Sequence, residues 1–193
     1  NADQAKRKAL VGLEEVGIDP GRFNAYPHEF SGGMRQRVVI ALALAAEPEL
    51  IIADEPTTAL DVSVQAQVLE LLKKLCRERN ASVMLITHDM GVIAETTDRV
   101  AVLYAGRLVE IGNTASLLSS PRHPYTRGLI ASTPSVEHGD ISTHLYQIDG
   151  SMPRLDALPT GCSFHPRCQD ALPRCRLSQP EVINERVACF LYE

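Results

Sequence analysis

The sequence predicts an α/β protein built on a parallel sheet, and two observations support this fold class. Helix-forming segments alternate along the chain with short apolar runs. Such alternation is typical of a parallel sheet with helices packed on it. Polar residues follow two of the apolar runs, Asp54-Glu55 after one and His88-Asp89 after the other. Ligands bind beyond the carboxyl ends of the strands in these sheets, so we expect the functional site there.

Three helices are predicted in the first 80 residues. The first ends at Val16, because the following Gly17 is a helix-stop signal. The second opens at Ser31-Gly32-Gly33 and continues to Glu47. The third covers about residues 62–80, and its apolar residues share one face. These residues are Val64, Val68, Leu71, Leu72 and Leu75.

Four strands are predicted. The apolar runs 50–53 and 82–87 are short and bounded by turn signals, as expected of buried strands. Residues 98–104 and 107–111 flank Ala105-Gly106, which indicates a hairpin.

The composition limits the classes of partner. The 193 residues carry a formal net charge of -5, which gives no electrostatic reason to expect a nucleic acid. The longest apolar stretch, residues 38–46, falls well short of the ~20 residues that span a bilayer. We therefore expect the chain to reach a membrane only through a partner.

Two short motifs suit phosphate chemistry. Glycines at the entrance of a helix let backbone N–H groups approach an anion, and the hydroxyl of Ser31 adds a polar group. Asp54 and Glu55 follow an apolar strand, where one carboxylate can hold Mg²⁺ and the next can orient or deprotonate water. Alternatively, the same residues suit a plain Ser-capped helix and a solvated acidic turn. His88 is likewise placed either as a phosphate sensor or as an ordinary loop residue.

Taken together, these motifs resemble one family, the ATPase domain of ABC transporters, which has a P-loop NTPase fold. The resemblance covers about residues 26–112 and corresponds to the second half of that domain. Phe30 and Met34 stand where the family usually has Leu and Gln. Four of its motifs are matched in order and spacing: the signature by Ser31-Gly32-Gly33, the Walker B pair by Asp54-Glu55, the D-loop by Ala59-Leu60-Asp61, and the switch histidine by His88.

The resemblance implies a role for each residue. Asp54 would help to hold Mg²⁺, Glu55 would be the general base or water-orienting carboxylate, and His88 would contact the γ-phosphate of ATP. Ser31-Gly32-Gly33 would cover the triphosphate bound by the opposite subunit, since two such domains sandwich two ATP molecules. Asp61 would lie in the same dimer interface.

One required motif is absent from the sequence. An ATPase of this class needs a G-x-x-x-x-G-K-[ST] loop to cradle phosphates, and no such string occurs. The family places this loop upstream of the signature, and the chain opens at Asn1 rather than Met. We therefore expect a fragment of a longer ATPase that does not hydrolyse ATP by itself.

The segment after residue 120 points to one group within the ABC transporter family. His123-Pro124-Tyr125-Thr126 is similar to the C-terminal extension of the ATPase subunits of oligopeptide and dipeptide importers. We predict three domains: the C-terminal part of an ABC ATPase domain over 1–112, an importer-type extension and linker over 113–160, and a Cys-rich tail over 161–193.

Four of the five cysteines lie in that tail, at Cys162, Cys168, Cys175 and Cys189. A cytosolic setting favours a metal or cluster over disulfides, and no Cys-x-x-Cys pair suggests a zinc ribbon. Thiolates from separated loops can hold a 4Fe–4S cluster, which the resemblance also implies. Zinc and free or oxidisable thiols are the alternatives. Cys76 lies near the apolar face of the third helix and is interpreted as a core residue.

Three functional hypotheses follow. The first is an ATP-hydrolysing, energy-coupling subunit of a bacterial peptide importer, at the cytoplasmic face of the plasma membrane. Its partners would be a second ATPase subunit, in a homodimer or heterodimer, transmembrane permease subunits and, indirectly, a substrate-binding protein. The second is a non-catalytic protein that completes the ATP site of a partner. The third is an ABC-type DNA-maintenance ATPase, which the acidic charge and the absence of a coiled coil disfavour.

Overall fold

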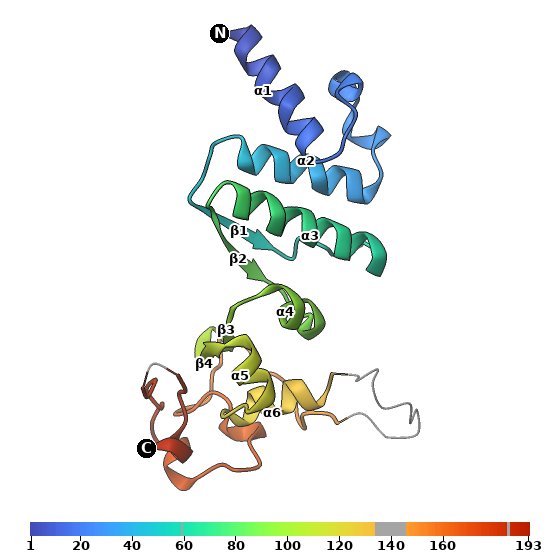
Figure 1. Cartoon of the computed structure of the whole chain (residues 1–193). Coiled ribbons are helices and arrows are strands. Elements are labelled where there is room, and N and C mark those ends of the chain that lie inside the picture. The colour runs from blue at the N-terminus through green and yellow to red at the C-terminus, as the bar shows by residue number, and fades with distance from the viewer. Residues whose placement is uncertain (59, 134–145, 185) are drawn as a thin grey trace. The chain divides into compact units, whose positions relative to one another are not determined.

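The structure is a computed structural model that describes residues 1–58, 60–133, 146–184 and 186–193. The chain divides into two compact units, residues 1–88 and 89–193, coloured along the chain in Figure 1. Each unit has its own apolar core. The domain boundaries after residues 112 and 160 were predicted from the family resemblance and stay a prediction. Ala59 and part of the predicted linker lie outside the described residues.

The first unit alternates helices with two strands, in agreement with the predicted order. Its elements are α1 (Ala2–Glu15), the short 3-10 helices η1 (Pro20–Asn24) and η2 (Pro27–Glu29), α2 (Gly32–Leu44), β1 (Leu50–Asp54), α3 (Val62–Glu78) and β2 (Ser82–Ile86). No helix among the described residues of the chain is long and apolar enough to span a membrane.

Local signals explain where these helices begin and end. Gly17 adopts a left-handed φ of 71° after α1, which is favourable for glycine at a helix end. α2 ends at Leu44, three residues before the predicted Glu47. Glu47 itself has a left-handed φ of 52°, so the helix cannot continue through it.

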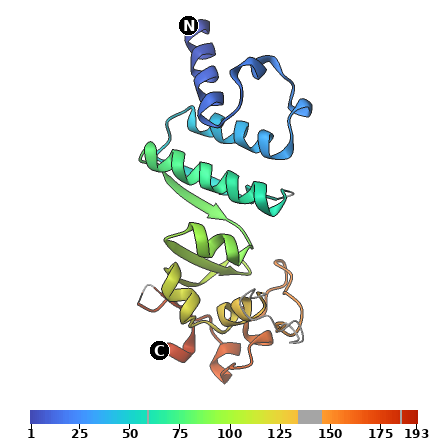
Figure 2. The same ribbon diagram turned by 45° about the vertical axis from the view of Figure 1, so that its right-hand side comes forward.

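The two strands β1 and β2 form the predicted parallel pair. Their register joins Leu50 to Ser82 at one end and Asp54 to Ile86 at the other. One face of the pair packs on the core, with Ile51 8% exposed. α3 supplies the apolar residues of that core, and Val68 is fully buried. Figure 2 shows α3 lying along the sheet, with α2 beside it.

The other face of this sheet is apolar and exposed. Alternate residues of the two strands point to it, because side chains alternate between faces along a strand. Leu50, Ile52, Met84 and Ile86 are between 46% and 61% exposed. A parallel sheet normally has both faces covered, so this face lacks its cover within the described residues.

The second unit contains a hairpin, short helices and the tail. Its elements are α4 (Met90–Thr96), β3 (Arg99–Tyr104), β4 (Arg107–Asn113), α5 (Thr114–Ser119), α6 (Pro124–Ala131) and the 3-10 helices η3 (His165–Arg167), η4 (Pro173–Arg176) and η5 (Phe190–Tyr192). The predicted hairpin is confirmed. β3 and β4 are antiparallel, and both turn residues, Ala105 and Gly106, have a positive φ.

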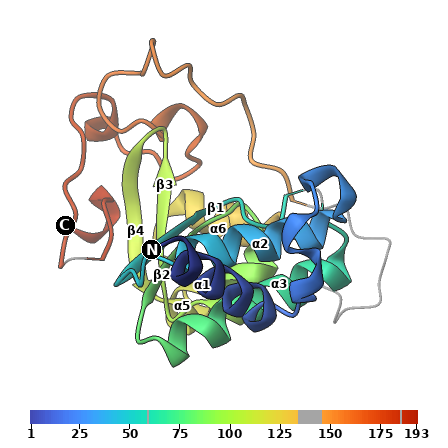
Figure 3. The ribbon, with the colours of Figure 1, turned by 90° about the horizontal axis from the view of Figure 1, so that it is seen from above.

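The tail adds a short extended segment to the hairpin. The N–H of Ile111 in β4 donates to the carbonyl of Arg186 at 2.7 Å, and the N–H of Ala188 donates to the carbonyl of Val109 at 2.9 Å. Figure 3 shows the C-terminal segment running beside β4. Cys189 follows directly, so backbone pairing with β4 fixes its position.

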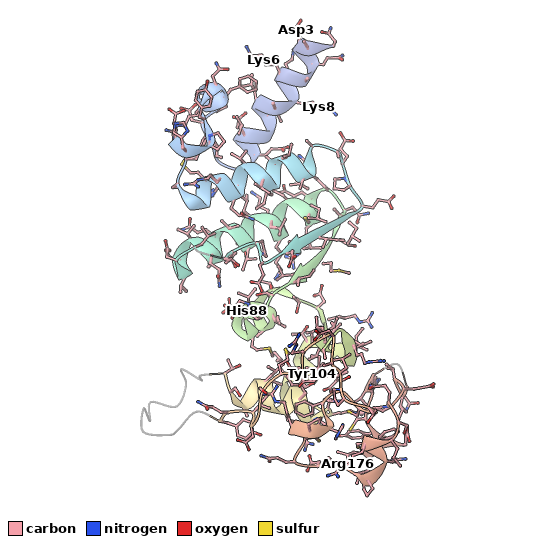
Figure 4. All side chains as sticks on the ribbon, turned by 180° about the vertical axis from the view of Figure 1, so that it is seen from behind. Asp3, Lys6, Lys8, His88, Tyr104 and Arg176 are labelled. Carbon is pink, nitrogen blue, oxygen red and sulfur yellow. The ribbon has the colours of Figure 1, made fainter. Side chains whose placement is uncertain are left out.

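An aromatic cluster joins the hairpin, α6 and the tail. Tyr104 is 1% exposed and its ring centroid lies 4.7 Å from that of Tyr125 and 5.1 Å from that of Phe164. Tyr104 is labelled in Figure 4, within the second unit. Burial of such rings dominates core energetics, so this cluster holds the tail against the hairpin.

Candidate functional site

The first candidate site lies at the carboxyl end of the parallel strands, where the sequence predicts it. The N–H of Glu55, the residue after β1, donates to the carbonyl of Ile86 at the end of β2. The side chain of Glu55 meets His88, with Oε1 at 2.7 Å from Nδ1. The hydroxyl of Thr58 donates to Oε2 at 3.3 Å. Both oxygens of this carboxylate are therefore oriented by neighbours.

The backbone at Glu55 is strained. Its φ is 46°, in the left-handed region that non-glycine residues rarely adopt. Such a conformation costs on the order of 1–3 kcal/mol and is concentrated at functional sites. Asp54, immediately before it, ends β1 and is exposed. The turn thus presents two successive carboxylates at the end of the sheet.

The hydrogen bond from His88 is the main cause that lowers the pKa of Glu55 below its ordinary value of 4.5. The carboxylate is therefore ionised at neutral pH, as a proton acceptor or water-orienting group must be. The pair remains accessible, since the side chain of Glu55 is 38% exposed and that of His88 is 87% exposed. Figure 4 labels His88 at the end of the first unit.

The glycines of the predicted signature have a packing role. A Cβ on Gly33 would lie 2.5 Å from Cγ1 of Val64, and one on Gly32 would lie 3.1 Å from Cδ2 of Leu60. The start of α2 thus lies against the start of α3. Ser31 is the N-cap of α2, and its hydroxyl accepts the N–H of Met34 at 3.3 Å. This is the plain helix cap that the sequence left open as an alternative.

Asp61 caps α3 in the same way. Its Oδ1 accepts the N–H of Val64 at 2.9 Å and the hydroxyl of Ser63 at 2.7 Å. The first of these bonds is the largest cause that lowers the pKa of Asp61. The structure therefore brings Asp61 close to the glycine segment, whereas Glu55 and His88 form their own pair. The roles of all these residues toward ATP stay predictions.

The second candidate site is a small cavity in the second unit, called here the cysteine cavity. Its volume is about 10 Å³, and its walls include Cys162, Cys168, Cys175 and Cys189. Four thiols from segments far apart in the tail thus share one cavity. Among the described residues, no group of three or more His, Cys, Asp and Glu side chains is arranged to hold a metal ion.

Glycine permits the close approach of two cysteine segments. The N–H of Cys162 donates to the carbonyl of Cys175 at 2.8 Å. Gly161 has a φ of 74°, and a Cβ there would collide with that same carbonyl oxygen. Gly161 directly precedes a cysteine in the sequence, but the contact with Cys175 that requires a glycine is seen only in the structure.

Burial favours the protonated form of three of these thiols. Burial raises the pKa of Cys162 and Cys189, and it raises the pKa of Cys168 to about 11. Cys76 lies outside this cavity. It is a residue of α3, is 2% exposed and packs in the core of the first unit. Its interpretation as a core residue is confirmed.

Comparison with known proteins decides the family. A family model described as ABC transporter matches residues 1–58, and one described as oligopeptide/dipeptide transporter, C-terminal region, matches residues 109–175. The chain is 50% identical, over 98% of its length, to the oligopeptide transport ATP-binding protein AppD of Bacillus subtilis. The chain belongs to the ATP-binding proteins of oligopeptide and dipeptide ABC transporters.

Other members of this family are equally similar. The chain is 52% identical, over 89% of its length, to the dipeptide transport ATP-binding protein DppD of Bacillus subtilis. It is also 52% identical, over 81% of its length, to the oligopeptide transport ATP-binding protein OppD of Haemophilus influenzae. The matched regions make up 59% of AppD, 51% of DppD and 48% of OppD, so the chain spans about half the length of these relatives.

Solved structures agree with the fold expected of this family. The dimeric post-hydrolysis state of the ATP-binding cassette MJ0796, bound to ADP and Pi, is 34% identical with a TM-score of 0.51. It covers 59% of this chain and 49% of that one. CbiO1 from Clostridium perfringens, part of the ABC transporter complex cbiONQ, is 28% identical with a TM-score of 0.54, covering 62% and 47%.

Two residues in the region that matches the transporter C-terminal model are buried, although the sequence indicated His123 only as part of a motif and did not indicate Glu110. Glu110 is 4% exposed, and its carboxylate accepts the backbone N–H groups of Arg122 and His123 at 2.8 and 2.9 Å. His123 is 1% exposed and lines the cysteine cavity. The His-Pro-Tyr stretch was the available signal for His123, whereas Glu110 had none.

Proposed function

We propose that the protein containing this chain is the ATP-hydrolysing, energy-coupling subunit of an ABC importer for oligopeptides or dipeptides. The observation that carries this proposal is the Glu55–His88 pair beyond the ends of β1 and β2. An ionised carboxylate held by a histidine at this position suits the orientation or deprotonation of water. The similarity to transport ATP-binding proteins supports the substrate class.

In this proposal, four residues of the chain have separate roles in ATP hydrolysis. Glu55 orients the attacking water or accepts its proton, and Thr58 and His88 hold the carboxylate in place. His88 also contacts the γ-phosphate, for which its high exposure leaves room. Asp54 is the exposed carboxylate available to Mg²⁺, which would neutralise charge on the phosphates.

The remaining site residues would act across a dimer. Ser31-Gly32-Gly33 would cover the triphosphate of a second ATPase subunit, and Asp61 would lie in the interface with it. The similar cassette MJ0796 is dimeric with ADP and Pi, which supports this arrangement. Permease subunits would be further partners, so the protein would lie at the cytoplasmic face of the plasma membrane.

The experiment that tests this function compares ATP turnover by the full-length protein and two variants. We expect Mg²⁺-dependent turnover that falls at least 100-fold in Glu55→Gln. Glu49→Gln is the matched control, because Glu49 is an exposed carboxylate just before the same strand. Equal loss in both variants, or full activity in Glu55→Gln, would contradict the proposal. A full-length protein that only stimulates a partner's turnover would support the non-catalytic alternative.

We propose further that the four thiols of the cysteine cavity hold a 4Fe–4S cluster. The support for this proposal is the donor set, because four separated segments each supply one thiol to the wall of one cavity. Each iron of such a cluster takes its own thiolate, whereas zinc would need all four at one ion. When bound, the cluster would tie the tail segments together. The neutral thiols would release their protons on binding.

Iron and sulfide analysis of anaerobically purified protein tests the cluster. We expect both elements, with visible absorbance near ~400 nm, to be lost in Cys168→Ala. Cys76→Ala should retain them, since Cys76 lies in the core of the first unit. Zinc in place of iron, or a protein without metal, would refute the cluster without affecting the ATPase proposal.

A further inference from the structure

A pocket in the second unit has the size of a small-molecule site. Its volume is about 320 Å³, and pockets for small ligands have volumes of about 300–1,000 Å³. It is called here the α6 pocket, because α6, labelled in Figure 1, forms one of its walls. Four residues at helical spacing make up this wall: Pro124, Arg127, Gly128 and Ala131. None of the described residues that line the pocket is a cysteine, so the pocket is independent of the proposed cluster.

A glycine lets a second wall lie directly against this helix. A Cβ on Gly128 would lie 2.8 Å from Cγ1 of Ile148 and 3.5 Å from Cε1 of Tyr146. The segment that carries these two side chains therefore packs on α6. The rings of Tyr146 and Phe164 both line the pocket, and they are 41% and 3% exposed. The walls thus offer aromatic and apolar surface to a ligand.

Arg167 brings a fixed positive charge to the pocket. Its Nε donates to the carbonyl of Asp149 at 2.8 Å, and its two terminal nitrogens donate to the carbonyl of Ile148 at 3.0 Å and the hydroxyl of Tyr104 at 3.5 Å. All three acceptors are neutral, and no carboxylate in the described part of the chain pairs with this guanidinium. A guanidinium has five N–H groups, of which these bonds use three, so two remain for a ligand.

A second arginine of the pocket already has a carboxylate partner. Arg127 pairs with Asp170 at 2.6 Å, and both side chains line the pocket. The charge of Arg167 is therefore the one that the lining residues leave uncompensated. A ligand with a single negative charge would neutralise it. A doubly charged phosphate group would exceed it and would be repelled by the carboxylate of Asp170.

We propose that the α6 pocket binds a small carboxylate that carries an aromatic or apolar group. The carboxylate would accept the remaining N–H groups of Arg167, because the planar fork of a guanidinium suits a carboxylate. The side group would contact Tyr146 and Phe164. Such a ligand would connect α6 to two other segments of the second unit, so its binding would stabilise this unit. A free carboxylic acid and the C-terminus of a short peptide have this chemistry in common.

The test is calorimetric titration of the full-length protein with phenylpropionate. We expect saturable binding at one site per chain. Arg167→Gln should weaken it by about 10-fold or more, because hydrogen bonds to a charged group are lost. Arg176→Gln is the matched control and should bind like the wild type. Arg176, labelled in Figure 4, is an exposed arginine of the same unit that does not line the pocket.

A second variant fills the pocket without changing Arg167. Ala131 is the exposed last residue of α6, and leucine there is a good helix former, so Ala131→Leu should keep the fold. Its larger side chain should compete with the ligand for the pocket and weaken binding by about 10-fold or more. This variant decides the question if Arg167→Gln does not fold. Unchanged affinity in either folded variant, or no saturable binding to the wild type, would overturn the inference.

Related ligands establish the chemical class and its source. Binding of alanylphenylalanine, lost with its C-terminal amide, would support the pocket as a site for the end of a peptide, whereas binding of phenylpropionate alone would support a free acid. Equal affinity for phenylpropanol, or displacement by an equal concentration of inorganic phosphate, would refute the carboxylate class. ATP turnover that depends on Glu55 is measured separately, so failure of this inference is distinguishable from failure of the proposed function.

Discussion

Replacement of Gly33 by alanine tests whether this glycine is required for packing or for phosphate. The added Cβ would lie 2.5 Å from Cγ1 of Val64, where ordinary contacts begin at 3.4 Å. Overpacking of this kind costs about 1–3 kcal/mol, against a gain of about 0.5–1 kcal/mol for replacing glycine within a helix. We therefore expect Gly33→Ala to lower the free energy of unfolding by about 1–2 kcal/mol.

A double-mutant cycle with Val64→Ala isolates this contact. Removal of the Val64 methyl groups relieves the collision, so the two substitutions should be coupled by about 1–3 kcal/mol. Urea denaturation of the wild type, both single variants and the double variant gives the coupling. Gly12→Ala is the control, because its Cβ would meet only Ala41 at 3.8 Å and should stabilise α1.

The result that would refute the packing argument is additivity within about 0.5 kcal/mol. ATP turnover by the full-length variants then separates the two roles of Gly33. Restored stability with restored turnover in the double variant assigns Gly33 to packing alone. Restored stability without turnover indicates that the backbone at Gly33 must also approach phosphate.

Three further predictions concern single residues. Glu110→Ala leaves two buried N–H groups unpaired and should cost about 2–4 kcal/mol in urea denaturation, whereas exposed Glu14→Ala should change stability by less than about 0.5 kcal/mol; equal effects would contradict this. Gly161→Ala, strained by its φ of 74° and by the carbonyl of Cys175, should cost about 2–3 kcal/mol, while Gly112→Ala, with open space around it, should be tolerated. His88→Ala should raise the pKa of Glu55 toward 4.5 in a ¹³C NMR titration, because the hydrogen bond that lowers this pKa is lost; an unchanged pKa would exclude His88 as the cause. In the wild type the lowered pKa stabilises the fold above pH 4.5, and that stabilisation disappears as the pH falls through the lowered value.

The extent to which the sequence predicted the fold follows from element length. α3 spans 17 residues with a repeating apolar face, and both parallel strands are continuous apolar runs, so local patterns were sufficient. α4 and α5 were not predicted, because seven and six residues are too few to show a helical period. The helix-stop signal Pro48 predicted an end at Glu47, whereas α2 ends at Leu44 and Glu47 already has a left-handed backbone.

The two candidate sites also differ in how far the sequence predicted them. Glu55 and His88 were expected near one another because both follow parallel strands, and topology alone brings such residues together. Burial of Glu110 depends on backbone groups 12 and 13 residues further along, which approach it only in the folded unit. The α6 pocket likewise depends on the packing of Ile148 against Gly128, which the sequence does not reveal.

Peptide uptake is the measurement that tests the central claim most directly. The full-length protein, reconstituted in vesicles with its permease subunits and partner ATPase, would be supplied with Mg-ATP and a labelled oligopeptide together with its binding protein. We predict ATP-dependent accumulation that is abolished by Glu55→Gln in this subunit and retained with Glu49→Gln. Undiminished uptake with Glu55→Gln would contradict the assignment of Glu55 to energy coupling.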